Sequence, residues 1–79
     1  MTTDEIYAGL ASVFDDVFEY EGPLGAETTS DDVDGWDSIG HIRLVLACEE
    51  KFGVSFKPAE AMGLKNLGAL VDLIAAKAG

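Results

Sequence analysis

The stretch Ser38–Phe52 most constrains the fold, because it carries the most regular helical pattern in the chain. At about 100° per residue its apolar side chains fall into two stripes, where a helix packed on one core needs only one. The stripe expected to face the core consists of Leu44, Val45, Cys48 and Phe52. The second stripe consists of Ile39, Ile42 and Leu46. A chain of 79 residues can hardly bury both, so we expect the second stripe to be exposed, the alternative being that Ile42 is also core.

The residues before this helix have the chemistry of a helix start. Asp and Ser side chains accept hydrogen bonds from the unpaired amides of a first turn, which makes Asp37-Ser38 a typical beginning. Ser38 also lies at the edge of the second stripe, and an exposed apolar patch beside a hydroxyl predicts a docking surface around a modifiable group. Trp36 is either a buried anchor or part of that surface. We favour packing and keep it among the docking candidates.

The rest of the chain predicts an all-α protein, a small four-helix bundle of three main helices and one short one. Residues 4–19 form the first helix, with Thr3 as its cap and apolar residues at three- and four-residue spacing. Gly53 ends the second helix, and Pro58 begins a brief helix over Pro58–Met62. Asn66 then caps a last helix that reaches about Ala78. Residues 1–79 make a single domain.

Residues 20–37 have no sustained hydrophobic period and the Gly, Pro, Thr and Asp content of a loop. The loop is long for so small a domain, and we expect Leu24, Val33 and Trp36 to anchor it.

This loop raises a calcium-binding alternative. If Gly35 takes position six of an EF-hand loop, Asp32 and Asp34 fall on positions three and five. Ser30 and His41 then occupy positions one and twelve, where an Asp and a bidentate Glu are needed. The two main ligands are therefore missing from an EF-hand-like site.

Charge is unevenly distributed along the chain, whose formal net charge is −10. Residues 1–42 hold eleven of the fifteen acids and no Lys or Arg, whereas residues 43–79 hold all five bases. Phosphate contacts need clustered Lys and Arg, so nucleic-acid binding is disfavoured. An acidic surface would instead attract basic partners toward Ser38. No stretch is apolar enough to span a membrane, and we expect a cytoplasmic monomer.

Catalytic and metal chemistry find little support. Ser38 and His41 are three residues apart, but no third group is evident that would orient the histidine as a base. We expect His41 to line the interior or its margin. One His and one Cys do not make a zinc site, and Cys48 fits a small core residue in a reducing compartment. The sequence therefore predicts a protein that is not an enzyme.

Several of these residues together resemble the carrier-protein family of fatty acid, polyketide and nonribosomal peptide synthesis. The resemblance rests on Asp37-Ser38-Ile39, residues 42–47 (IRLVLA) and residues 49–53 (EEKFG), and the chain's length and helix order agree. It implies that Ser38 bears a covalent 4′-phosphopantetheine arm from coenzyme A, whose thiol holds an acyl or aminoacyl group as a thioester. It also implies that Asp37 helps to bind the magnesium ion of the phosphopantetheinyl transferase.

The resemblance further implies partners: that transferase, a loading ligase or transferase, and downstream synthase enzymes. We expect Trp36, Ile39, Ile42, Arg43 and Leu46 to form the docking surface for them. This chain departs from the fatty-acid pattern at Gly40, where a second acid often follows the serine, at the unusual His41, and at Arg43, which replaces a typical Glu. The departures favour a dedicated polyketide, aminoacyl or nonribosomal pathway, with general fatty acid synthesis as the alternative.

Overall fold

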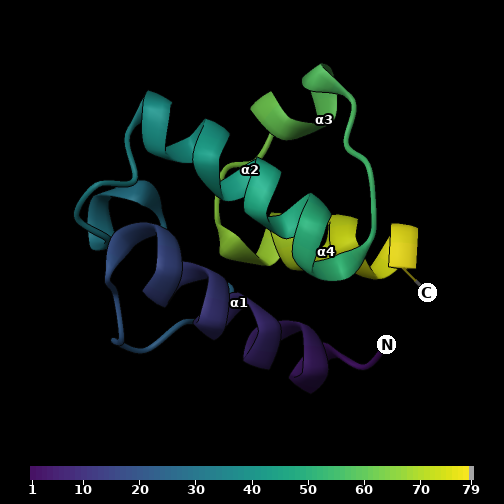
Figure 1. Cartoon of the computed structure of the whole chain (residues 1–79), viewed down its shortest axis with the longest axis horizontal. Coiled ribbons are helices and arrows are strands. Elements are labelled where there is room, and N and C mark those ends of the chain that lie inside the picture. The colour runs from purple at the N-terminus through teal and green to yellow at the C-terminus, as the bar shows by residue number, and fades with distance from the viewer. Residues whose placement is uncertain (79) are drawn as a thin grey trace.

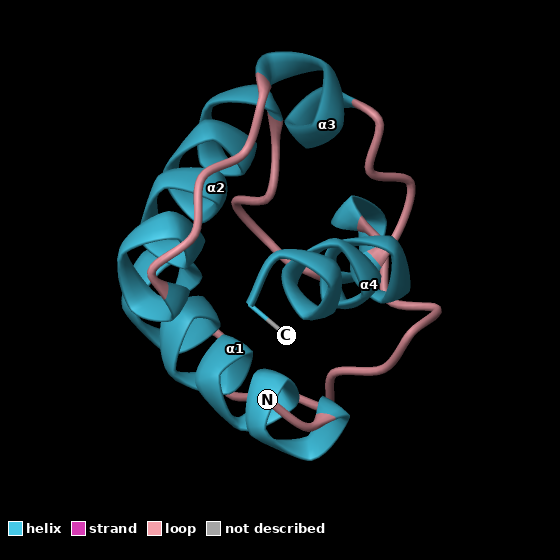
Figure 2. Cartoon of the chain, turned by 90° about the vertical axis from the view of Figure 1, so that its right-hand side faces the viewer, coloured by secondary structure: helices cyan, strands magenta, loops and turns pink. Residues whose placement is uncertain are grey.

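Three long helices enclose the core of the protein, whose computed structural model describes residues 1–78. They are α1 (Thr3–Phe18), α2 (Ser38–Phe52) and α4 (Leu67–Ala78), and the short helix α3 (Pro58–Met62) lies outside them (Figure 1). Figure 2 shows the molecule rotated by 90° about the vertical axis. In this view α1 and α2 lie together, α4 lies opposite them, and α3 lies above the space between α2 and α4. The predicted all-α, four-helix architecture is confirmed.

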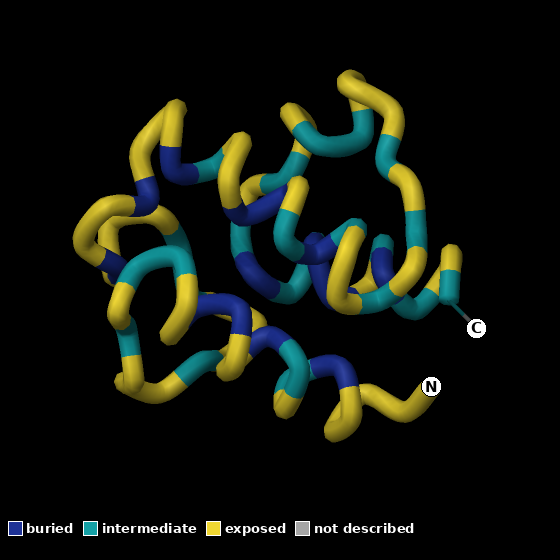
Figure 3. The backbone as a smooth tube through the Cα atoms, viewed as in Figure 1, coloured by how far each residue is buried: buried dark blue, intermediate teal, exposed yellow. Residues whose placement is uncertain are grey.

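The core is built from the inward faces of the long helices and two side chains of the first loop. Its members are buried because apolar residues recur every three or four positions, which turns one stripe of each helix inward (Figure 3). The buried apolar cluster comprises Ile6, Leu10, Val13, Phe14, Val33, Trp36, Leu44, Cys48, Leu67, Leu70, Val71 and Ile74. The predicted core stripe of α2 is confirmed for Leu44, Val45 and Cys48, which are buried, while Phe52 is half-buried against the cluster.

The beginning of α1 differs by one residue from the prediction. The cap is Thr2 and not Thr3, because the Thr2 hydroxyl accepts from the Glu5 amide at 3.2 Å while the Glu5 carboxylate accepts from the Thr2 amide at 2.8 Å. This reciprocal pair satisfies two amide donors that the helix leaves unpaired. It also lowers the pKa of Glu5, since the backbone and side-chain hydrogen bonds to Thr2 favour the charged carboxylate.

The end of α1 also differs by one residue, because Glu19 is not helical and takes the left-handed conformation (φ 54°) after Phe18. The remaining helix boundaries follow local signals, as the sequence predicted. Gly53 ends α2 in the left-handed conformation (φ 65°) and Pro58 occupies the first position of α3. Asn66 caps α4, because its side-chain oxygen accepts from the Ala69 amide at 2.9 Å.

The long first loop is held by hydrogen bonds that the sequence did not reveal. It contains a short 3₁₀ turn (Ser30–Asp32), and two of its carbonyls accept from the first amides of α4. The Leu67 amide donates to Thr28 at 2.8 Å and the Gly68 amide donates to Ala26 at 3.0 Å. Because the loop satisfies amides that no helical carbonyl reaches, it follows a defined path toward the start of α2.

Candidate functional site

The site begins at the first turn of α2, where Ser38 is the first helical residue. Asp37 caps the helix through its Oδ1 atom, which accepts from the Gly40 amide at 2.7 Å. Asp37 and Ser38 are both exposed. Within residues 1–78, no carbonyl or side chain accepts from the amides of Ser38 and Ile39. The cap therefore presents the serine hydroxyl to solvent at the positive end of a helix dipole.

Gly40 lets the loop pass directly over this first turn. A Cβ atom at this position would lie 2.0 Å from the Gly35 carbonyl oxygen and 2.9 Å from the Phe18 ring. Gly35 itself has a φ of 89°, a conformation that L side chains rarely adopt. The absence of an acid after the serine thus has a packing cause, because any side chain at Gly40 would displace the backbone that leads to Asp37.

His41 joins three segments of the chain around the serine. The Trp36 Nε1–H donates to His41 Nδ1 at 3.0 Å, and the two ring planes differ by only 9°. The other ring nitrogen, Nε2, lies 2.7 Å from the Ala61 carbonyl oxygen of α3. Since an indole N–H can only donate, Nδ1 must carry the lone pair and Nε2 the proton that is donated to Ala61. His41 is therefore a neutral imidazole with both ring nitrogens occupied.

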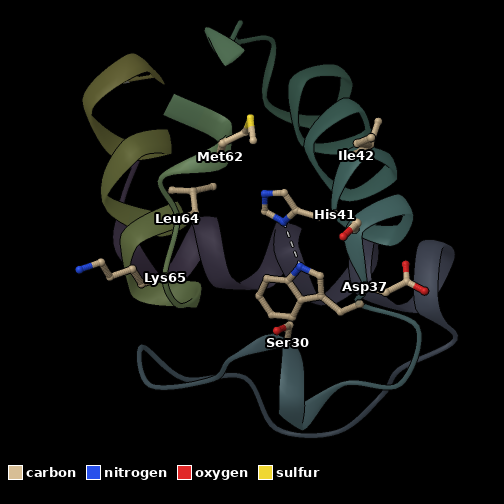
Figure 4. Close-up of a pocket in the computed structure, with 9 residues that line it drawn as sticks. Ser30, Asp37, His41, Ile42, Met62, Leu64 and Lys65 are labelled. Atoms are coloured by element: carbon tan, nitrogen blue, oxygen red, sulfur yellow. Dashed lines mark hydrogen bonds between the residues drawn. The ribbon is translucent and has the colours of Figure 1, made fainter. Parts of the chain in front are cut away.

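A groove of about 580 Å³ lies beside Ser38, between α2 and the segment that contains α3 (Figure 4). Ile42 and Met62 face each other across it, with His41 between them. Nine residues line the groove: Ser30, Trp36, Asp37, Ser38, His41, Ile42, Met62, Leu64 and Lys65. We call this feature the Ser38 groove. Its lining combines apolar side chains with hydroxyl, carboxylate and imidazole groups, so it offers both contact area and polar partners to a molecule that enters it.

The second stripe of α2 is exposed. Ile39, Ile42 and Leu46 have 72%, 60% and 59% of their surface accessible, while the opposite stripe is buried. The alternative in which Ile42 belongs to the core is therefore wrong. Arg43 is exposed as well. A continuous apolar stripe left in water beside a modifiable hydroxyl is the surface expected of a partner-binding helix.

Trp36 is only 8% exposed, unlike the other docking candidates. Its ring meets Phe14 edge-on at a centroid distance of 5.4 Å, and its N–H is bound to His41. Packing is thus its main role, because the core leaves little of the indole for a partner to touch. Sequence reasoning also missed Met62, which is 84% exposed on α3 and extends the apolar surface across the groove. The sequence could not predict the exposure of Met62, since α3 has only five residues and shows no hydrophobic period.

The first loop shows no arrangement for a metal ion. Among residues 1–78, no group of three or more His, Cys, Asp or Glu side chains is placed to hold one. Instead, the Asp32 carboxylate accepts from the Thr29 amide at 2.9 Å and stabilises the 3₁₀ turn. Burial raises the pKa of the Cys48 thiol to about 12, which disfavours the thiolate that metal binding and nucleophilic attack require. No helix in the described part of the chain is long and apolar enough to cross a membrane.

Comparison with known proteins identifies the family of this chain. Residues 10–74, which include the whole of α2, match the family described as "Phosphopantetheine attachment site". The chain belongs to this family. Its members are carriers and not catalysts, and the prosthetic group is phosphopantetheine.

Two curated relatives are called "Acyl carrier protein". The one from Acidothermus cellulolyticus is 35% identical over 77 residues, which covers 95% of this chain and 90% of the relative. The one from Renibacterium salmoninarum is 36% identical over 80 residues, covering 94% and 93%. The solution NMR structure of holo acyl carrier protein from Geobacter metallireducens has the same fold, with a TM-score of 0.80 and 35% identity over 96% of this chain and 84% of that one. The acyl-carrier resemblance is therefore confirmed for the family and the fold.

Proposed function

We propose that Ser38 carries the 4′-phosphopantetheine arm and that the chain presents an acyl or aminoacyl group to partner enzymes. The observation that carries this proposal is an exposed hydroxyl on the first residue of α2, in a chain of the phosphopantetheine-attachment family. When attached, the arm ends in a thiol that holds the cargo as a thioester. Tethering keeps that cargo at a high effective concentration near the active site of each docked enzyme.

The residues around Ser38 fit a phosphodiester. The amides of Ser38 and Ile39 are available at the positive end of α2, and such an end favours a negatively charged group without any basic side chain. The hydroxyl also opens onto the Ser38 groove, into which the arm can fold. These features support attachment at Ser38 in preference to Ser30, which lines the same groove from the 3₁₀ turn.

Asp37 is proposed to help the phosphopantetheinyl transferase bind its magnesium ion. Its Oδ1 atom caps α2, and among residues 1–78 no donor occupies Oδ2. Oxygen of an exposed carboxylate is the ligand that magnesium prefers. One side chain can therefore hold the helix start and still offer an oxygen to the metal of a docked enzyme.

The exposed stripe of Ile39, Ile42 and Leu46 is proposed to be the docking surface for the transferase, the loading enzyme and the downstream synthase enzymes. Arg43 lies on the same helix and gives this surface a positive charge, whereas Gly40 and His41 contribute no carboxylate. We therefore propose a dedicated polyketide, aminoacyl or nonribosomal pathway and not general fatty acid synthesis. The buried, unpaired Cys48 supports a reducing cytoplasmic location, and we expect a monomer.

Attachment can be tested with purified protein, coenzyme A, magnesium and a broad-specificity phosphopantetheinyl transferase. Wild type should gain one arm by intact mass, whereas Ser38→Ala should remain folded and unmodified. Ser30→Ala is the matched control, because it removes the other serine of the Ser38 groove and should still be modified. Modification of the Ser38→Ala protein would refute the assignment.

A further inference from the structure

α3 is fastened to the rest of the molecule mainly by polar contacts, because none of its side chains is buried. The Glu60 carboxylate pairs with Lys77 of α4 at 3.0 Å. The Ala61 carbonyl accepts from His41 of α2 at 2.7 Å. Carbonyls in the last turn of a helix have no partner within that helix, so the imidazole supplies the bond that the Ala61 carbonyl lacks. A helix held in this way depends strongly on each polar contact.

The same imidazole also holds the loop that leads to Ser38. Trp36 Nε1–H donates to Nδ1 at 3.0 Å, and Trp36 directly precedes the cap residue Asp37. One neutral side chain in the first turn of α2 therefore bonds to a segment on each side of the Ser38 groove. In Figure 4 the His41 ring lies in the middle of the groove, between Ile42 on one side and Met62 and Leu64 on the other.

We propose that His41 is a positioning residue: as a neutral imidazole protonated on Nε2, it fastens both the loop before Ser38 and the end of α3 to α2 and so sets the shape of the Ser38 groove. The consequence for carriage rests on the proposed function, since the groove matters to partners only if Ser38 bears the arm. The fastening itself follows from the two hydrogen bonds.

Protonation of Nδ1 should break the hydrogen bond between His41 and Trp36. It removes the acceptor of the Trp36 N–H and points two N–H groups at each other, while Nε2–H still faces Ala61. The charged groups that line the groove with His41 are Asp37, at the start of α2, and Lys65, between α3 and α4. The loop contributes only the neutral Ser30 and Trp36. A proton on Nδ1 would therefore loosen the Trp36 side of the groove and leave the Ala61 side in place.

The tautomer can be observed directly in the wild-type protein. The ¹⁵N shifts of the His41 ring at neutral pH should show a protonated Nε2 and an unprotonated Nδ1. The chain has one tryptophan, so the indole N–H signal and the fluorescence both report Trp36 alone. Both signals should change when a substitution of His41 removes the Nδ1 acceptor of the indole N–H. An imidazolium or an Nδ1–H tautomer at neutral pH would overturn the proposal.

Two variants test the fastening. His41→Phe keeps a ring but no hydrogen bond, and His41→Gln keeps an acceptor and a donor on one amide. In His41→Phe, hydrogen exchange of the Trp36 indole and of the Ala61 and Gly63 amides should accelerate about threefold to tenfold, the change that one hydrogen bond typically makes. His41→Gln should restore much of the protection, and the amides of α1 should be unaffected. Unchanged α3 exchange in His41→Phe, or an equal loss of protection throughout α1, would overturn the proposal.

Loading with the arm separates this inference from the proposed function. If wild type is loaded at Ser38 but α3 exchange is the same in His41→Phe, the positioning role is wrong and the carrier role stands. If exchange responds as expected but wild type is never loaded, the carrier role is wrong and the fastening stands. If both hold, His41→Phe should raise the KM for the transferase more than it lowers kcat, and His41→Gln should recover the wild-type KM.

Discussion

Replacing Gly40 by alanine tests the close approach on which the geometry of the site depends. The added Cβ would lie 2.0 Å from the Gly35 carbonyl oxygen, well inside the 3.4 Å at which ordinary contact begins. The obstructing atom is backbone and not the end of a flexible side chain, so the loop itself must move by more than an ångström. That loop carries Trp36 and Asp37, and therefore both the His41 hydrogen bond and the cap of α2.

Two opposing terms set the size of the effect. Forcing extra volume into a packed site costs typically about 1–3 kcal/mol. Alanine is favoured over glycine within a helix by about 0.5–1 kcal/mol. Because a backbone contact at 2.0 Å cannot be relieved by a rotamer change, the first term should win. We expect Gly40→Ala to lose about 1–2 kcal/mol of unfolding free energy, which lowers the melting temperature of a domain of this size by roughly 4–16 °C.

Urea unfolding followed by circular dichroism would measure this change. Gly25→Ala is the matched control, because its Cβ would meet nothing within 4 Å and its φ is not in the left-handed region. Reduced chain freedom in the unfolded state should leave that control as stable as wild type or more stable by a few tenths of a kcal/mol. A Gly40→Ala protein as stable as the Gly25→Ala control would refute the close packing of the loop on α2.

Substitutions at three further positions separate folding from recognition. Asp37→Ala should lose about 1 kcal/mol of unfolding free energy, because it removes the cap of α2. Asp37→Asn should keep the cap and its stability but be loaded poorly by the transferase. Efficient loading of Asp37→Asn would contradict the magnesium role of the carboxylate. Ile42→Ala should lose far less unfolding free energy than Leu44→Ala, for which about 2–5 kcal/mol is expected of a core truncation. It should nevertheless slow transfer by partner enzymes. Equal losses for the two variants in paired melts would place Ile42 in the core. Arg43→Glu should melt like wild type and be accepted better by fatty-acid-type enzymes in a loading assay, whereas unchanged preference would contradict the proposed pathway.

The sequence predicted best those features that arise within one or two turns of chain. Asp37, Gly53 and Asn66 begin or end helices through their own side chains or backbone conformation, so their neighbours suffice to identify them. The cap of α1 was misplaced by one position because Thr2 and Thr3 are both plausible. Glu5 decides the matter, since it lies three residues after Thr2 and completes a reciprocal pair.

Contacts between segments could not be predicted in the same way. The bond between His41 and Ala61 joins residues twenty positions apart, and it depends on where α3 comes to lie. Likewise, the sequence shows Gly40 only as the absence of an acid, while the structure places the Gly35 carbonyl oxygen where a side chain at Gly40 would begin. Both features depend on where the long first loop and the short helix α3 come to lie. Neither segment has a hydrophobic period from which its position could be predicted.

The most direct test of the central claim is to locate the arm on the protein after loading. Wild type would be incubated with coenzyme A, magnesium and the transferase, digested, and fragmented in a tandem mass spectrometer, with a known acyl carrier protein loaded in parallel as a control. A single phosphopantetheine on Ser38, and none on Ser12, Ser30 or Ser55, is the predicted result. An arm found on one of those other serines, or an unmodified chain beside a fully loaded control, would contradict the proposed function.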